Sequence, residues 1–442
     1  MKKMLYRLFP SLLVLALPAA ALAETTVSST SIMRFRQNDL PGFDKKTMVP
    51  VTEFVGLDAT KLADGNLSAH IYGWGQVELA DRDSNDTKTD GNLTYGYLQY
   101  RFKSANAQAK AGRFFVNEGI LNEQVDGVGA RTDLPYGFAI SGFGGATVHT
   151  TSIPYAGNDG KGDGIWGGRM SYRYAGKLEV GLAGVYESTA PMPKTSPTLP
   201  TAFGDHRLIG YDLYLNPHPM LQLSGQTSYN PTTEHIAENS YLLQLRPLKD
   251  LAVGATWEEH HDRDYFFDSL LFSNMVRNLS QQSHSLGATA TYTFKVAEVS
   301  ADFKHYTRDI GKAERFGGEV RSNSLFNNTV RAGVSYHYLR SSGDFAIVPA
   351  SDASGSFHEI RGWAMRDTKT YFASGDVIAY VFKEKVDNKD AAWEGTASVG
   401  YHITPQLAVS GDISYGQNPD YNDELKGLIR VTYNFTAKGG SK

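Results

Sequence analysis

The sequence of 442 residues contains no cysteine. Without sulfur from cysteine, the chain cannot build a disulfide framework, a cysteine-ligated zinc or iron–sulfur site, a thiol nucleophile or a covalent attachment for c-type haem. We therefore expect no cofactor on this chain. Any redox group that works with it would belong to a partner.

Long apolar runs and an excess of positive charge are also missing. After the first 23 residues, no segment approaches the roughly 18 consecutive apolar residues of a transmembrane helix, and the mean hydropathy is −0.35. The 43 Lys and Arg side chains are outnumbered by 47 Asp and Glu. Because nucleic-acid binding needs a basic surface, we expect no nucleic-acid partner.

The N-terminus has the features of a secretory signal peptide, which we place at residues 1–23. Lys2, Lys3 and Arg7 precede an apolar run, and the small residues of Ala21–Ala23 form a cleavage box. The mature chain is expected to begin at Glu24 and to be exported past the inner membrane.

Period-two alternation of apolar and polar residues dominates the mature chain. Segments such as Leu221–Tyr229 and Ser285–Phe294 alternate cleanly, while helical periodicity is almost absent. Very short turns, among them residues 175–177 and 404–406, recur between longer polar connections, and aromatic residues lie near segment ends. Short turns, long loops and aromatic girdles are typical of outer-membrane barrels. A secreted all-β sandwich or solenoid would alternate in the same way.

The chain resembles the Gram-negative outer-membrane porins. Lys426–Phe435 looks like the closing strand of that family, although Thr436 to Lys442 follow it. The stretch from Asp64 through Asp90, Arg113–Phe115 and Glu123–Gly127 to Arg131–Pro135 more narrowly resembles porin-type proteins of metal-reducing bacteria. Members of that group are linked with selenite and tellurite reduction or with porin–cytochrome conduits.

The pattern predicts an all-β fold, a transmembrane antiparallel up-and-down barrel of about 16 strands, with a range of about 14 to 18. We place the barrel at residues 67–435, a periplasmic N-terminal segment at 24–66 and a C-terminal tail at 436–442. Residues 341–370 break the pattern, and two further strands could lie there or at Thr30–Arg36.

Residues 117–163 are interpreted as one long connection, because a single extra strand there would move every later short turn to the other side. In porins a long early loop folds into the lumen, so this segment is the candidate constriction. Its charged residues are Glu118, Glu123, Asp126, Arg131 and Asp133. Charges facing the wall would set a field across the bore. The alternative is an outward loop that covers the pore mouth.

Alternation also places a group of basic residues on the lumen face: Arg101, Lys110, Arg169 and Arg173. In the expected strand order they come from three successive strands and form one patch that would favour anions or oxyanions. The alternative is that they are solvated wall charges balanced by Glu78 and Glu179.

No enzyme is expected. In Glu258–Asp264 adjacent residues point to opposite faces and cannot converge on a metal ion, and Ser283–Ser285 lacks the context of a barrel phospholipase. The expected function is passive transport of small hydrophilic solutes through the outer membrane, in contact with its lipid and, by resemblance, as a homotrimer. The alternative is a sleeve around an exported multihaem cytochrome. A barrel protease or lipase ranks last.

Overall fold

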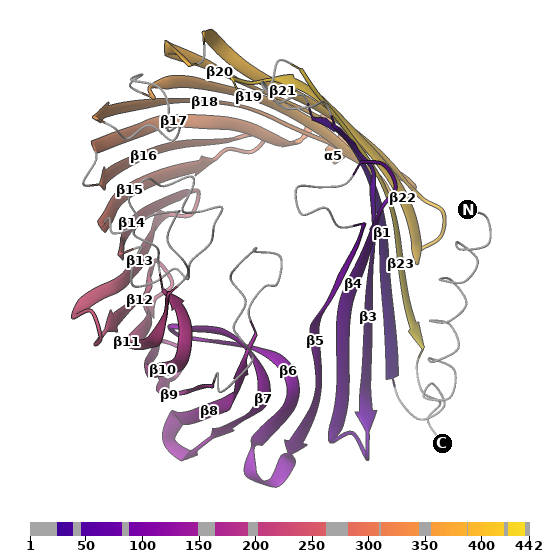
Figure 1. The fold of residues 1–442 in the computed structure, drawn as a ribbon. Coiled ribbons are helices and arrows are strands. Elements are labelled where there is room, and N and C mark those ends of the chain that lie inside the picture. Colours follow the sequence, from indigo (N-terminus) through magenta and orange to yellow (C-terminus); the bar gives the residue numbers. More distant parts are fainter. Residues whose placement is uncertain are drawn as a thin grey trace, which may run out of the picture.

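The computed structural model describes residues 24–38, 46–81, 88–148, 164–192, 202–261, 282–308, 311–343, 355–386, 388–419 and 423–437. The described residues form one antiparallel sheet that curves around a wide lumen and closes on itself (Figure 1). Among them, no helix is long and apolar enough to cross a membrane. The expected signal peptide at residues 1–23 lies outside the described residues.

The strands in chain order are β1 (Glu24–Asn38), β2 (Lys46–Met48), β3 (Pro50–Leu62), β4 (Leu67–Glu78), β5 (Thr89–Phe102), β6 (Ala107–Glu118), β7 (Leu121–Asp133), β8 (Phe138–Thr147), β9 (Ile165–Tyr174), β10 (Leu178–Met192), β11 (Ala202–His218), β12 (Leu221–Asn230), β13 (His235–Leu248), β14 (Leu251–His261), β15 (Gln282–Thr293), β16 (Glu298–Arg308), β17 (Gly311–Ser324), β18 (Val330–Gly343), β19 (Phe357–Asp367), β20 (Tyr371–Val386), β21 (Lys389–His402), β22 (Leu407–Gln417) and β23 (Glu424–Ala437). One short helix, α5 (Leu325–Asn328), joins β17 to β18.

The barrel closes by pairing its first strand with its last. β1 pairs with β23 from Thr25↔Ala437 to Arg36↔Lys426. β2 and β3 pair with β1 in one continuous register on either side of Val49, so together they make a single strand of the wall. The wall therefore has 22 strands, and the expected count of about 16 was wrong.

The uncounted strands lie in three parts of the chain. β1 and β2–β3 occupy the segment 24–66, so the wall begins at Glu24 rather than at Leu67. β7 and β8 occupy much of 117–163, and β17 and β19 flank β18. β23 runs on to Ala437, which shortens the expected tail; residues 438–442 lie outside the described part. Each of the three parts contains two additional strands. The short turns that the sequence predicted therefore still lie on one side of the barrel.

Alternation is weak in these strands because serine or glycine interrupts the series of large apolar side chains on their outer faces. Alternation is visible only where one face is consistently apolar. On β1 the residues that share a face with Met33 include Ser29 and Ser31, and their hydroxyls bond to Glu53 of β3. On β19 the order is inverted, because Gly362 faces outward while Trp363 faces the lumen and donates to Glu319 of β17.

The short connections lie at one end of the barrel, which we call the turn end. Glu24 and Ala437 lie there, as do the turns at 63–66, 103–106, 134–137, 175–177, 219–220, 249–250, 294–297, 325–329, 368–370 and 403–406. The opposite, loop end is mixed. It includes the connections that begin after β8 and β14 and the short one between β12 and β13, whereas the two-residue turn Gly119–Ile120 lies inside the barrel, next to Asp212.

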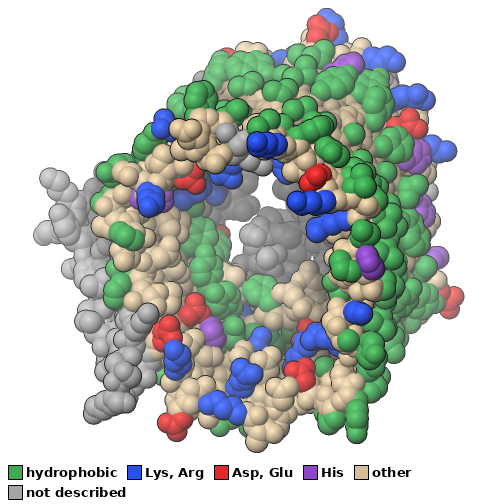
Figure 2. All heavy atoms as spheres, turned by 180° about the vertical axis from the view of Figure 1, so that it is seen from behind, with side chains coloured by type: hydrophobic (Ala, Val, Ile, Leu, Met, Phe, Trp, Pro, Cys, Tyr) green, Lys and Arg blue, Asp and Glu red, His purple; other side chains and the backbone are tan. Residues whose placement is uncertain are grey.

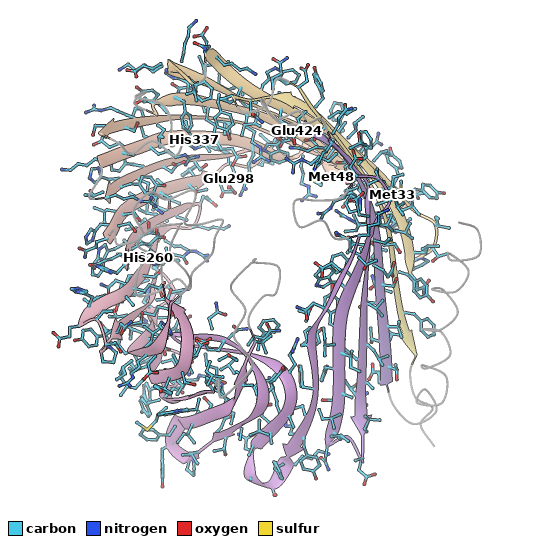
Figure 3. The ribbon with its side chains drawn as sticks, in the orientation of Figure 1. Met33, Met48, His260, Glu298, His337 and Glu424 are labelled. Carbon is cyan, nitrogen blue, oxygen red and sulfur yellow. The ribbon has the colours of Figure 1, made fainter. Side chains whose placement is uncertain are left out.

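The two faces of the wall have opposite chemistry. Large apolar side chains point outward, such as Val334 and Leu286, which are 62% and 58% exposed. Charged side chains gather around the central opening, and green apolar side chains cover much of the outside in Figure 2. Figure 3 shows Glu298, His337 and Glu424 on the inner side of the ribbon and Met33 on the outer side. An apolar exterior around a polar lumen is the pattern of a membrane barrel.

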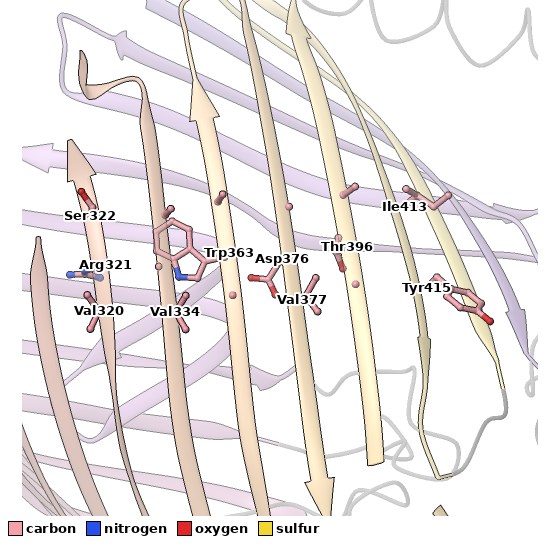
Figure 4. A pocket seen from close by; sticks show the side chains of 17 residues that line it. Val320, Arg321, Ser322, Val334, Trp363, Asp376, Val377, Thr396, Ile413 and Tyr415 are labelled. Carbon is pink, nitrogen blue, oxygen red and sulfur yellow. The ribbon is translucent and has the colours of Figure 1, made fainter. Parts of the chain in front are cut away.

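A hollow of about 850 Å³ lies on the outer face of β17 to β22 (Figure 4). Gly362, Gly375 and Gly395 form its floor, and a Cβ built on Gly362 would meet nothing within 4 Å. Val334 and Ile413 stand at its sides. Because this hollow faces away from the lumen, it contributes nothing to the inner surface.

Candidate functional site

The hairpin of β6 and β7 leaves the wall and folds into the lumen. β6 pairs with β5 only as far as Gly96↔Arg113, whereas β6 and β7 go on pairing with each other to Glu118↔Leu121. The bend lies at Gly112, whose φ is +123° and where any Cβ would overlap the carbonyl oxygen of Gly96. Only glycine adopts this conformation readily, so Gly112 permits the turn away from β5.

The tip of the hairpin rests on a buried ion pair of the wall. Arg169 of β9 binds Asp212 of β11 through two contacts of 2.6 and 2.8 Å, and Glu179 of β10 through one of 3.0 Å. The Arg169 side chain is only 6% exposed. A Cβ on Gly119 at the tip would overlap the Asp212 carboxylate, and one on Gly181 would overlap the same pair from the wall side. The ion pair is therefore enclosed between two glycines.

A second polar contact holds the tip. Glu118 binds Arg131 of β7 at 3.1 Å and accepts a hydrogen bond from the Ser141 hydroxyl of β8. Arg131 and Ser141 are direct neighbours across β7 and β8, and Ser141 is in turn the neighbour of Arg169. The tip thus contacts one continuous row of the inner wall.

Apolar side chains fill the space beneath the hairpin. Phe114, Leu121 and Val125 of the hairpin are almost fully buried, at 2%, 1% and 0% exposure. They pack in one cluster with lumen-facing residues of the wall, namely Ile165, Ala183, Val185 and Leu208. Because water would otherwise cover these wall residues, their burial holds the hairpin down. Burying side chains of this size stabilises by about 1.5–3 kcal/mol each.

The expected basic patch does not form as one unit. β7 and β8 lie between β6 and β9, so Arg101 and Lys110 are separated from Arg169 and Arg173. Arg173 and Arg169 both bind Glu179. The Lys110 amino group lies 5.3 Å from the centre of the Tyr97 ring, and Arg101 forms no ion pair with any described residue.

The remaining predicted residues lie at different points of the hairpin. Asp126 binds Arg113 through two contacts of 2.7 Å. Asp133, near the turn end, lies 3.8 Å from Arg131. Glu123 faces Val116 within the tip. The part of the expected long loop from residue 149 to 163 lies outside the described residues.

A charged cluster farther round the barrel was not predicted. Asp302 of β16 binds Arg315 of β17 at 3.0 Å and His337 of β18 at 2.8 Å. Glu359 of β19 lies 3.5 Å from Arg315 and 3.3 Å from His337. Two of its four members lie on strands that alternation did not reveal. We call these four residues the ion-paired wall.

The described residues contain no group of three or more His, Asp or Glu side chains able to hold a metal ion. Glu258, from one of the metal-capable runs of the sequence, binds Lys304 at 2.7 Å. The next residues of that run, 262–264, lie outside the described part.

Comparison with known proteins gives a fold but no family. No protein-family model matches the sequence, and no curated protein is similar to it. The ferric enterobactin receptor PfeA of Pseudomonas aeruginosa, in complex with BCV-L6, superposes with a TM-score of 0.58 at 11% identity, covering 93% of this chain and 82% of the receptor. OccAB4 of Acinetobacter baumannii superposes with a TM-score of 0.47 at 12% identity, covering 95% of this chain and 100% of OccAB4. OccK8 (OprE) of P. aeruginosa superposes with a TM-score of 0.45 at 10% identity, covering 94% of this chain and 98% of OccK8. The likeness to PfeA supports a large antiparallel barrel and says nothing of what passes through it.

Proposed function

We propose that this protein is an outer-membrane channel for small hydrophilic solutes, narrowed by the β6–β7 hairpin. The observation that carries the proposal is the hairpin tip itself, which lies against the Arg169–Asp212 pair and is held by Glu118 to Arg131 and Ser141. Around it the inner wall is polar and the outer wall apolar, as a channel in a bilayer requires. A fixed hairpin of this kind sets the size of solute that passes.

Single-channel recording of the purified protein in planar bilayers tests this proposal. The protein should conduct ions, with a size cut-off for polyethylene glycols added to the bath. Gly119→Leu cannot place its side chain beside Asp212, so it should displace the tip, raise the conductance and admit larger polymers. Gly75→Leu is the matched control, because a Cβ there meets nothing within 4 Å. Absence of conductance, or an unchanged cut-off in Gly119→Leu, would contradict the proposal.

A modest preference for anions is the finer part of the proposal. Many lumen charges are cancelled by a partner, as Lys304 is by Glu258 and Lys426 by Glu394 and Glu424. Four exposed basic residues form no ion pair within the described part of the chain: Arg101, Arg246, Arg331 and Arg430. These unpaired guanidinium groups would attract anions such as carboxylates or oxyanions.

A sleeve around an exported multihaem cytochrome is less well supported. Such a partner would need the bore free for a folded protein, whereas the hairpin tip occupies part of the lumen in front of Ala183 and Val185. Export through the signal peptide and assembly as a homotrimer stay predictions. Cleavage before Glu24 in the mature protein and the mass of the purified complex would test them.

A further inference from the structure

Aromatic rings line the inner face of the strands that lead to the hairpin. Phe54 of β3 and Tyr72 of β4 stack at 6.5 Å between ring centres, and Tyr72 stacks on Tyr95 of β5 at 5.5 Å. His70 stacks on Tyr97 at 4.9 Å, and Tyr95 lies 6.0 Å from Tyr97. We call these five residues the aromatic wall.

The aromatic wall faces the lumen and ends at the constriction. Ile71, the neighbour of both His70 and Tyr72 along β4, is 48% exposed on the outer face, so the rings point inward. Tyr72 leans over Gly56, where a Cβ would lie 3.0 Å from its ring. At the other end Tyr97 meets Phe114 of the hairpin edge-on, at 6.4 Å. A solute moving along these rings therefore arrives at the hairpin.

The hydroxyl groups of this wall are free to bind a solute. Tyr72, Tyr95 and Tyr97 form no side-chain hydrogen bond with any described residue. Each phenol can both donate and accept. Two charged groups lie nearby: Asp58, which binds His70 at 2.6 Å, and Lys110, whose amino group lies over the Tyr97 ring and forms no ion pair with any described residue. The five residues themselves therefore offer apolar rings and neutral hydroxyls, with the Lys110 cation at the Tyr97 edge.

We propose that the aromatic wall binds neutral saccharides on their way to the hairpin, an inference that rests on the proposed channel function. A sugar ring presents C–H groups on its faces and hydroxyls around its edge, which matches rings with free phenol groups. An anion would find a single cation at the edge of the aromatic wall, Lys110, and stacked rings along the rest of it. A purely apolar solute would leave the phenols without partners, which costs free energy.

The test is the interruption of single-channel current by maltohexaose. The wild-type channel should show reversible, concentration-dependent block, and Tyr72→Ala and Tyr95→Ala should each weaken the apparent affinity about fivefold. Tyr95→Phe keeps the ring and removes the hydroxyl, so it should weaken the apparent affinity for maltohexaose less than Tyr95→Ala does. Block is compared with each variant's own open current, which also shows that the variant has assembled.

Tyr401→Ala is the control, because this tyrosine is 54% exposed on the outer face and should not affect block. Equal block by hexaglutamate would overturn the assignment to neutral saccharides, as would equal block in wild type and both alanine variants. An open channel that no sugar interrupts would refute the saccharide site and leave the channel intact. A protein that never conducts would instead refute the proposed function.

Discussion

The inner faces of β3 to β5 carry aromatic rings whose hydroxyls bond to no described residue, whereas the inner faces of β16 to β19 carry ion pairs. On the aromatic wall, Tyr72 and Tyr95 touch each other and leave their polar atoms to the lumen. On the ion-paired wall, Asp302 and Glu359 share Arg315 and His337 between them. One surface leaves its hydrogen-bonding groups open to the lumen, and the other uses them within the protein.

In the proposed channel, this difference separates two tasks of the wall. Ion pairs that bridge four neighbouring strands fix the strands relative to one another, and their charges cancel before a solute meets them. The His337 side chain, at 10% exposure, has little contact with the lumen. Stacked rings hold their own geometry by mutual contact and add no net charge. We infer that the ion-paired wall maintains the shape of the bore and that the aromatic wall meets the solute.

The largest expected effect concerns the outer faces, where the two walls should behave alike. Ile71 lies behind the aromatic wall and Val334 behind the ion-paired wall, and both face outward. Replacing either with Arg should destabilise the barrel by about 2–4 kcal/mol near the middle of the bilayer. Urea unfolding in lipid vesicles measures this free energy. Thr289→Arg, on the lumen face, is the control and should cost far less; equal costs at all three positions would mean that the faces are wrongly assigned.

Outward apolar residues of this kind were also what made the barrel predictable from the sequence. Where large side chains alternate, as in Leu221–Tyr229, both the strand and its inner face follow from the pattern, and alternation placed Arg169, Glu179 and Asp212 on the lumen side. Their contact across β10 could not be predicted, because it depends on register and on the space above Gly181.

The sequence contains one indication of the inward hairpin that the alternation of apolar and polar residues does not reveal. Leu182–Tyr186 is apolar or small at every position, so Ala183 and Val185 are apolar on a face that should meet water. Apolar residues on both faces of a strand indicate burial on both sides. The buried cluster under the hairpin provides that second side. The sharp bend at Gly112 had no comparable signal, since a glycine in a strand marks many kinds of irregularity.

An intermediate effect should separate the inner faces. Arg315→Met removes the guanidinium from Asp302 and Glu359, which are 25% and 19% exposed, and leaves two carboxylates close together. We expect a loss of about 2 kcal/mol, below the 3–5 kcal/mol of a fully buried pair because water reaches this cluster. Tyr97→Phe on the aromatic wall should change the unfolding free energy by less than about 0.5 kcal/mol. If urea unfolding showed a larger loss of unfolding free energy for Tyr97→Phe than for Arg315→Met, the proposed division of tasks between the two walls would be wrong.

The smallest expected effect is on charge selectivity, and it sharpens the comparison because it depends on whether a charge is paired. Arg331→Gln and Arg430→Gln remove exposed charges that have no ion partner in the described part of the chain, so the reversal potential in a salt gradient should move towards lower anion preference. The double variant Arg361→Gln, Asp376→Asn removes a pair joined at 2.7 Å and should leave that potential nearly unchanged. The recordings belong at about 0.1 M salt or below, where the Debye length of roughly 10 Å lets a wall charge act on a passing ion. If the paired and unpaired variants shift the potential equally, pairing does not decide which wall charges a solute senses.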